Sequence, residues 1–120
     1  MKTKYKLIYN YFNNNKLIES NKYILNIESN ILSFKQRDNI NTIINLKDKY
    51  LLKKGSINFE LKLIENIDQE LIIQVNQGID NLEHKVLINI QELQIKENKM
   101  IIIFLKDNSD LIKEEYIWEK

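Results

Sequence analysis

The chain of 120 residues contains no cysteine, no proline and no alanine, and it has only two glycines, one tryptophan and one histidine. The absence of cysteine excludes disulfide scaffolds, cysteine-ligated zinc sites and cysteine nucleophiles. A single histidine, His84, excludes metal sites built from several histidines. No nucleophile, metal-ligand set or acid–base pair stands at a recognisable spacing. An enzyme is therefore the least supported class of function, and we predict no cofactor and no metal.

Long apolar runs are also absent. The longest uninterrupted run spans Met100 to Leu105, whereas a membrane-spanning helix needs about 20 residues. The first residues are basic, but the segment after them is too short and too polar for the core of a signal peptide. We therefore expect no membrane association and a cytoplasmic location.

The composition that remains is globular. Apolar residues form 43% of the chain and charged residues 29%, which is close to the usage of folded domains. Ile, Asn and Lys dominate, with 22, 17 and 17 copies. Because their codons are rich in A and T, we attribute this bias to an AT-rich bacterial or protist genome and not to a nucleic-acid-binding surface. No linker interrupts the chain, so we expect one domain over residues 1–120.

The charge is unevenly distributed along the chain. The net charge is +1, but residues 1–64 carry +7 and residues 65–120 carry −6. The basic half could form a face for an anionic partner. The interpretation that we favour is that basic and acidic strands become neighbours in a sheet and pair across it.

Apolar residues recur at every second position, which is the period of a β-strand. In the clearest case, Ile57, Phe59, Leu61 and Leu63 share one face. Residues 82–97 also approximate a helical spacing, but their β-branched alternation favours a strand. Residues 99–105 are apolar on both faces, which suggests a strand covered on both sides, by a neighbouring element or by a second subunit. The same alternation occurs at residues 5–11, 23–27, 71–75 and 86–90.

Clusters of Asn, Asp, Ser and Gly separate these segments and indicate turns. They occur at residues 13–15, 20–21, 29–30, 38–39, 47–48, 54–56, 66–68, 76–81, 97–98 and 107–110. Many short strands at this spacing indicate an all-β sandwich or barrel, and short turns favour a meander of adjacent hairpins. The longest polar interruption, residues 76–83, is expected to be a loop or corner.

Five segments in this order resemble the YwiB-like proteins, which are small bacterial domains of unknown function. They are Tyr23-Ile24-Leu25-Asn26, Ile31-Leu32-Ser33-Phe34, Leu51 to Ile57, Met100 to Phe104, and Glu114 to Trp118. Lys53 or Lys54 stands where the family has an arginine-like residue, and the threonine-rich run before its last hairpin is replaced by residues 87–93. The resemblance implies an all-β, antiparallel, calycin-like (lipocalin-like) barrel, consistent with a count of about eight to ten strands in meander order, and carries over no functional residue.

Three residues are candidates for lining a ligand cavity. His84 shares a face with Val86 and could be a polar anchor at the barrel mouth, although a solvated histidine at a strand end is the simpler interpretation. Tyr116 and Trp118 lie near the end of the chain, where their rings could line a cavity or simply complete the core. Glu114 shares their face and could be an acid in a pocket, but we expect it at the rim.

Other polar features have simpler interpretations. Arg37 is the only guanidinium, yet it stands in an expected turn, where it is solvated. Glu114 and Glu115 point to opposite faces of a strand and cannot be paired catalytic carboxylates. Residues 53–56 resemble a phosphate-binding loop only superficially, and we expect a hairpin turn with Gly55 in the left-handed position.

We therefore predict a non-enzymatic barrel that binds a small, largely apolar ligand inside it. The first alternative is a structural or protein-interaction module with a packed interior, oligomeric through residues 99–105. The second is weak binding of single-stranded nucleic acid, which we disfavour because the basic residues are spread out.

Overall fold

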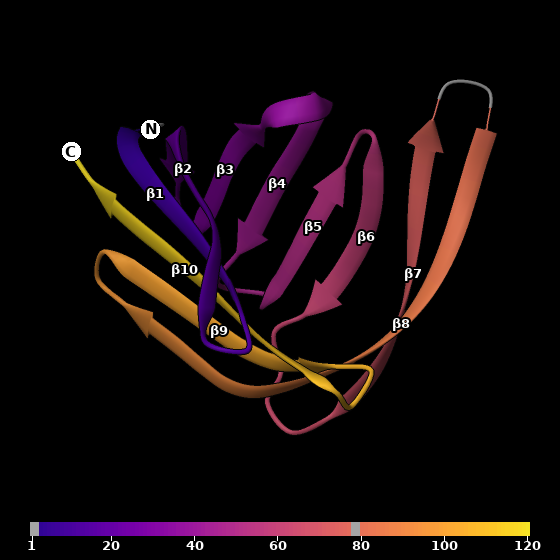
Figure 1. The fold of residues 1–120 in the computed structure, drawn as a ribbon. Helices are drawn as coiled ribbons and strands as arrows, with labels where there is room; N and C mark the ends of the chain where they lie inside the picture. The colour runs from indigo at the N-terminus through magenta and orange to yellow at the C-terminus, as the bar shows by residue number, and fades with distance from the viewer. Residues whose placement is uncertain (1–2, 78–79) are drawn as a thin grey trace.

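Ten strands and one turn of 3-10 helix make up residues 3–77 and 80–120, the part of the chain that the computed structural model describes. The strands form a closed antiparallel barrel in which each is bonded to the next along the chain and β1 meets β10 (Figure 1). The all-β class, the meander order and the strand count are confirmed. No helix in these two ranges is long and apolar enough to cross a membrane. The elements are β1 (Thr3–Asn13), β2 (Lys16–Glu28), β3 (Ile31–Gln36), η1 (Arg37–Asn39), β4 (Ile40–Asn45), β5 (Tyr50–Lys54), β6 (Ile57–Lys62), β7 (Asp68–Gln77), β8 (Asp80–Lys96), β9 (Lys99–Lys106) and β10 (Asp110–Glu119).

Asparagine and other polar residues make most of the turns, as predicted. Asn14 and Asn15 both have positive φ, and so do Asp107 and Asn108. Two successive positive φ values are typical of tight hairpin turns whose twist matches that of the flanking strands. Asn tolerates this conformation better than most residues, so a chain with few glycines still makes sharp turns.

Two predicted interruptions are wrong. Residues 20 and 21 lie inside the continuous strand β2, where Ser20 pairs with Asn10 and its hydroxyl donates to the Asn10 side chain at 2.6 Å. Much of the predicted loop at 76–83 belongs to β7 and β8, with Asn76 opposite Asn81; residues 78–79 lie outside the described ranges. In both hairpins the strands continue into solvent, where polar side chains suit both faces of a strand.

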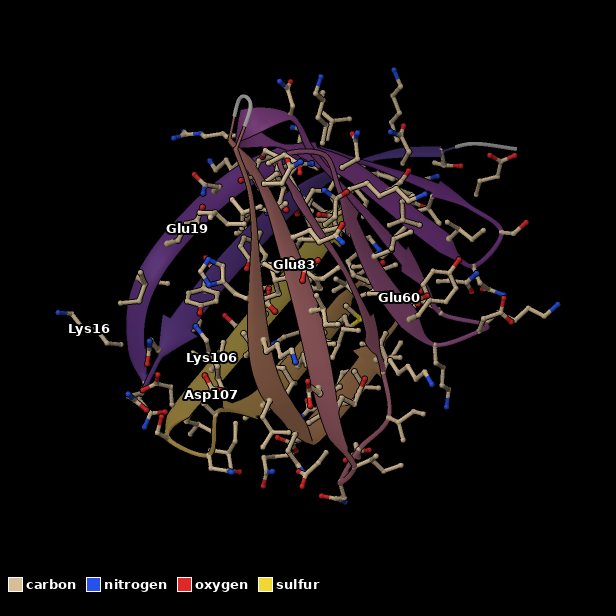
Figure 2. The ribbon with its side chains drawn as sticks, turned by 90° about the vertical axis from the view of Figure 1, so that its right-hand side faces the viewer. Lys16, Glu19, Glu60, Glu83, Lys106 and Asp107 are labelled. Carbon is tan, nitrogen blue, oxygen red and sulfur yellow. The ribbon has the colours of Figure 1, made fainter. Side chains whose placement is uncertain are left out.

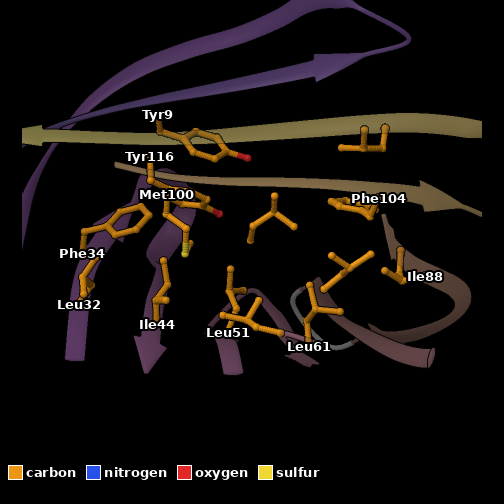
Figure 3. Close-up of a cluster of buried hydrophobic side chains, with 14 of the residues drawn as sticks. Tyr9, Leu32, Phe34, Ile44, Leu51, Leu61, Ile88, Met100, Phe104 and Tyr116 are labelled. Atoms are coloured by element: carbon orange, nitrogen blue, oxygen red, sulfur yellow. The ribbon is translucent and has the colours of Figure 1, made fainter. Parts of the chain in front are cut away.

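The alternation of the sequence is confirmed by burial. The odd-numbered residues of β1 and β6 and the even-numbered residues of β10 point inward. One half of the interior, on the side of β3 and β4, is filled by large side chains (Figure 3). Tyr116 packs there at 5.1 Å from Tyr9 and 6.2 Å from Phe34, measured between ring centroids. The buried side chains labelled on this side are Leu32, Phe34, Ile44, Met100 and Tyr116.

Strand β9 is covered on both sides, as its composition predicted. Its inward residue Ile102 is fully buried, and its outward residue Ile101 is only 7% exposed. The cross-strand neighbours of Ile101 are Gln94 and Glu115, whose long side chains share the outward face. Neighbouring strands of the same chain thus account for this cover, and a second subunit at residues 99–105 remains a proposal.

The ion pairs of the described residues lie within one charged half of the chain. Within residues 3–77 and 80–120 the ion pairs are Lys85 with Glu70 and Lys113 with Glu115, and both connect residues of the acidic half. Lys6 stands opposite Glu119 where β1 and β10 close the barrel. The predicted pairing between basic and acidic strands is therefore limited to this one position of the closing ladder.

Candidate ligand-binding cavity

The second half of the barrel interior contains a cavity of about 210 Å³. An apolar cavity of about 150 Å³ is large enough to bind benzene. Apolar and aromatic side chains supply most of the wall, which is typical of small-molecule sites. The lining residues are Tyr9, Tyr11, Leu51, Lys53, Phe59, Leu61, Leu71, Ile73, Val86, Ile88, Phe104, Lys106 and Glu114.

The cavity exists because the inward side chains differ in length between the two halves of the barrel. Strands β7 and β8 present only aliphatic residues to the cavity, whereas Phe34, Tyr116 and Trp118 cross the other half. An aliphatic side chain extends less far from its strand than an aromatic one, so the centre opposite β7 and β8 stays open. Ten strands also enclose a wider interior than the eight that side chains just fill.

The polar centre of this cavity is the carboxylate of Glu114, which is 8% exposed. Tyr9 donates its hydroxyl to Oε2 of Glu114 at 2.5 Å, and Tyr116 donates to the same oxygen at 3.0 Å. Burial first, and then the charge of Glu114, raise the pKa of both tyrosines well above the ordinary value of 10.0. The hydroxyls therefore stay protonated and keep donating. In Figure 3 both point toward the half of the interior that contains Phe104 and Ile88.

Two lysines line the same cavity and are less deeply buried. Lys53 extends inward from β5, with Nζ 6.0 Å from the ring centroid of Tyr9. Lys106 lies at the end of β9 beside Asp107, whose carboxylate accepts the backbone N–H of Leu87 at 2.9 Å (Figure 2). Lys53 and Lys106 are both half-buried, in contrast to Glu114.

Beside the cavity, the backbone pairing between strands β6 and β7 is incomplete. These strands share two ladder positions, at Ile57 and Asn58 of β6. Farther along, the Gln69 amide replaces a backbone partner: the N–H of Lys62 donates to Oε1 at 3.0 Å, and Nε2 donates to the Lys62 carbonyl at 2.7 Å. Leu71, two residues beyond Gln69, lines the cavity. One half-buried side chain, that of Gln69, thus bridges the wall here.

The three residues predicted to line a cavity lie in different places. Tyr116 and Trp118 are buried in the packed half, where Tyr116 reaches the cavity only through its bond to Glu114. His84 is exposed on β8 opposite Ile73. The structure brings Tyr116 and Trp118 together on β10 and leaves His84 apart, and whether they contact a ligand stays a prediction.

The other expectations can be compared with the structure directly. Arg37 is exposed in η1, as expected, and Gly55 has a φ of +131° in the turn between β5 and β6. Glu115 points outward and pairs with Lys113 at 3.5 Å. The rim position expected for Glu114 is wrong: its carboxylate is buried because β1 covers it with Tyr9. No group of three or more possible metal ligands occurs in the described part of the chain.

Sequence reasoning missed two contributors to the site, Lys53 and Lys106. Their signal was present in the alternation, since Lys53 shares a face with Leu51 and Lys106 shares one with Phe104. A lysine at a position where the alternating pattern expects an apolar residue predicts a charged side chain that points into the barrel. The strand pattern alone does not say that these positions face one another.

The comparisons with known proteins concern the fold. No protein-family model matches the chain, and no curated protein sequence does. The crystal structure of YwiB protein from Bacillus subtilis superimposes with a TM-score of 0.67 at 13% sequence identity, covering 98% of this chain and 92% of that one. The predicted resemblance to the YwiB-like proteins is thus confirmed at the level of the fold: this chain is a ten-stranded barrel similar to YwiB along nearly its whole length.

Proposed function

We propose that the protein binds one small, largely apolar molecule inside its barrel and catalyses no reaction. The observation that carries the proposal is the cavity of about 210 Å³, with its apolar wall and a single buried carboxylate. A few fixed polar groups in an apolar wall orient a ligand, whereas chemistry requires a nucleophile or an acid–base set beside the reacting atom. The proposal includes a calycin-like mode of binding, inside the barrel, and a cytoplasmic location.

Native mass spectrometry of the purified protein, compared with a denaturing spectrum, tests the proposal. We expect a non-covalent mass that disappears on unfolding. The matched variants are Ile73→Trp and Ile72→Trp, because Ile73 lines the cavity whereas its neighbour Ile72 points outward and is 49% exposed. Ile73→Trp fills the cavity and is expected to abolish the bound mass, and Ile72→Trp to retain it. Equal retention by both folded variants would refute an interior site.

The same native spectrum reports the subunit number. A stable oligomer without any bound mass would favour the alternative, an interaction module assembled through residues 99–105. A bound mass on a monomer would reject that alternative and support the cavity.

A further inference from the structure

The two oxygens of the Glu114 carboxylate differ in their hydrogen bonds. Both tyrosine hydroxyls bond to Oε2, and Oε1 accepts no hydrogen bond within residues 3–77 and 80–120. Glu114 also forms no ion pair with any lysine or arginine of those ranges. Burial of a carboxylate without a counter-charge is unfavourable. The two tyrosines hold the group in one orientation, and Oε1 is left to the cavity that Glu114 lines.

The aromatic part of the wall suits a cation. Tyr9, Tyr11, Phe59 and Phe104 all line the cavity, and the faces of aromatic rings attract positive charge. A ligand ammonium at Oε1 would supply the missing counter-charge and the missing hydrogen-bond donor together.

The lysines point to the opposite chemistry. Lys53 and Lys106 could hold an anionic head group at the same cavity. Both are only half-buried, however, whereas Glu114 is 8% exposed and forms no ion pair within residues 3–77 and 80–120. A ligand of opposite charge therefore stabilises Glu114 more than it stabilises either lysine.

We propose that the ligand is an amphipathic amine, with its protonated nitrogen donating to Oε1 of Glu114 and its apolar body against β7 and β8. This inference rests on the proposed function, because it concerns the occupant of the same cavity. By comparison with the benzene-sized cavity of about 150 Å³, the ligand has about eight to ten non-hydrogen atoms.

The test uses three probes with one chain length and different head groups: hexylamine, 1-hexanol and hexanoate. Their dissociation constants are measured at neutral pH by titration followed in two-dimensional NMR spectra. We expect hexylamine to bind at least tenfold more tightly than 1-hexanol, and hexanoate to bind weakest. Glu114→Gln keeps the shape and is expected to weaken hexylamine at least tenfold while changing 1-hexanol less than threefold.

The control variant is Glu115→Gln, which removes the adjacent carboxylate on the opposite face of β10 and is expected to change neither affinity. If Glu114→Gln does not fold, the NMR signals of the side-chain carboxyl carbons are measured in the unmodified protein instead. Hexylamine is expected to shift the signal of Glu114 and not the signal of Glu115. Tightest binding of hexanoate, equal binding of all three probes, or an unshifted Glu114 signal would overturn the amine while leaving an interior binding site intact. Failure of all three probes to bind, together with a bare native mass, would overturn the proposed function as well.

Discussion

Replacement of Gly55 by alanine is expected to destabilise the barrel by an amount that the structure allows us to estimate. Gly55 has a φ of +131°. A Cβ there would overlap the carbonyl oxygen of Asn39 and lie 3.0 Å from the carbonyl carbon of that residue and 3.3 Å from Cα of Ile40. All three atoms belong to the backbone, so no side-chain rotation relieves the overlap. Either the turn between β5 and β6 or the start of β4 must move.

The magnitude follows from three contributions. A non-glycine residue in this region of φ costs about 1–3 kcal/mol. The Gly55 carbonyl accepts bonds from Asn58 Nδ2 at 2.8 Å and from Asn76 Nδ2 at 3.1 Å, and their disturbance costs about 1 kcal/mol. Alanine restricts the unfolded chain, which returns about 0.4–1 kcal/mol. The net loss is about 2 kcal/mol, or a midpoint of thermal unfolding lower by about 8 °C for a domain of this size.

Thermal and urea unfolding measure this change. Trp118 is the only tryptophan and is 4% exposed, so its fluorescence reports the loss of the core. The matched control is Lys54→Ala, at the exposed last residue of β5 next to the turn, which is expected to change the free energy of unfolding by less than about 0.5 kcal/mol. A Gly55→Ala variant as stable as this control would refute the argument from backbone overlap.

Three further outcomes are expected. Lys49→Gly removes the backbone strain of a lysine with a φ of +55°. It is expected to stabilise the protein by about 0.5 kcal/mol in urea unfolding, because the strain removed exceeds the entropy that glycine adds to the unfolded chain. Destabilisation would contradict this. Gln69→Ala removes both bonds to the Lys62 backbone and is expected to cost about 1 kcal/mol and to speed hydrogen exchange at the Lys62 amide; unchanged exchange there would argue against the bridge. Burial raises the pKa of Tyr9 and Tyr116 above 10.0 in the folded protein, so their stabilising contribution is complete below pH 10 and is lost as the pH rises above it. Absorbance titration at 295 nm is expected to show that these two tyrosines ionise only when the protein unfolds. Their ionisation in the native protein would contradict the structure.

The strands and most turns were predictable from the sequence because they depend on local rules. Side chains alternate between the two faces of a strand, so positions such as Leu61 and Ile88 carry their inward direction in their spacing. The turn at Asn14 and Asn15 was likewise visible, since few other residues tolerate its backbone conformation. Residues 20–21 show the limit of this reasoning. The same polar residues also occupy a strand whose two faces meet solvent, and the sequence alone does not distinguish the two cases.

The cavity was beyond prediction because it depends on which strands face each other across the barrel. Alternation placed Glu114 on the face of Tyr116, but its depth depends on the register that sets Tyr9 opposite Tyr116 in the closing ladder. That ladder pairs Tyr9 with Tyr116, which lie more than 100 positions apart in the chain, so no local pattern encodes it.

The sequence by itself thus determined the fold class, the succession of hairpins and the inward face of most strands, since each follows from the geometry of a few consecutive residues. Only the tertiary structure decided that one half of the interior is filled and the other open, and that the Glu114 carboxylate is buried beside Tyr9. These features arise from side chains of different length meeting across a closed barrel, where distance in space is unrelated to distance along the chain.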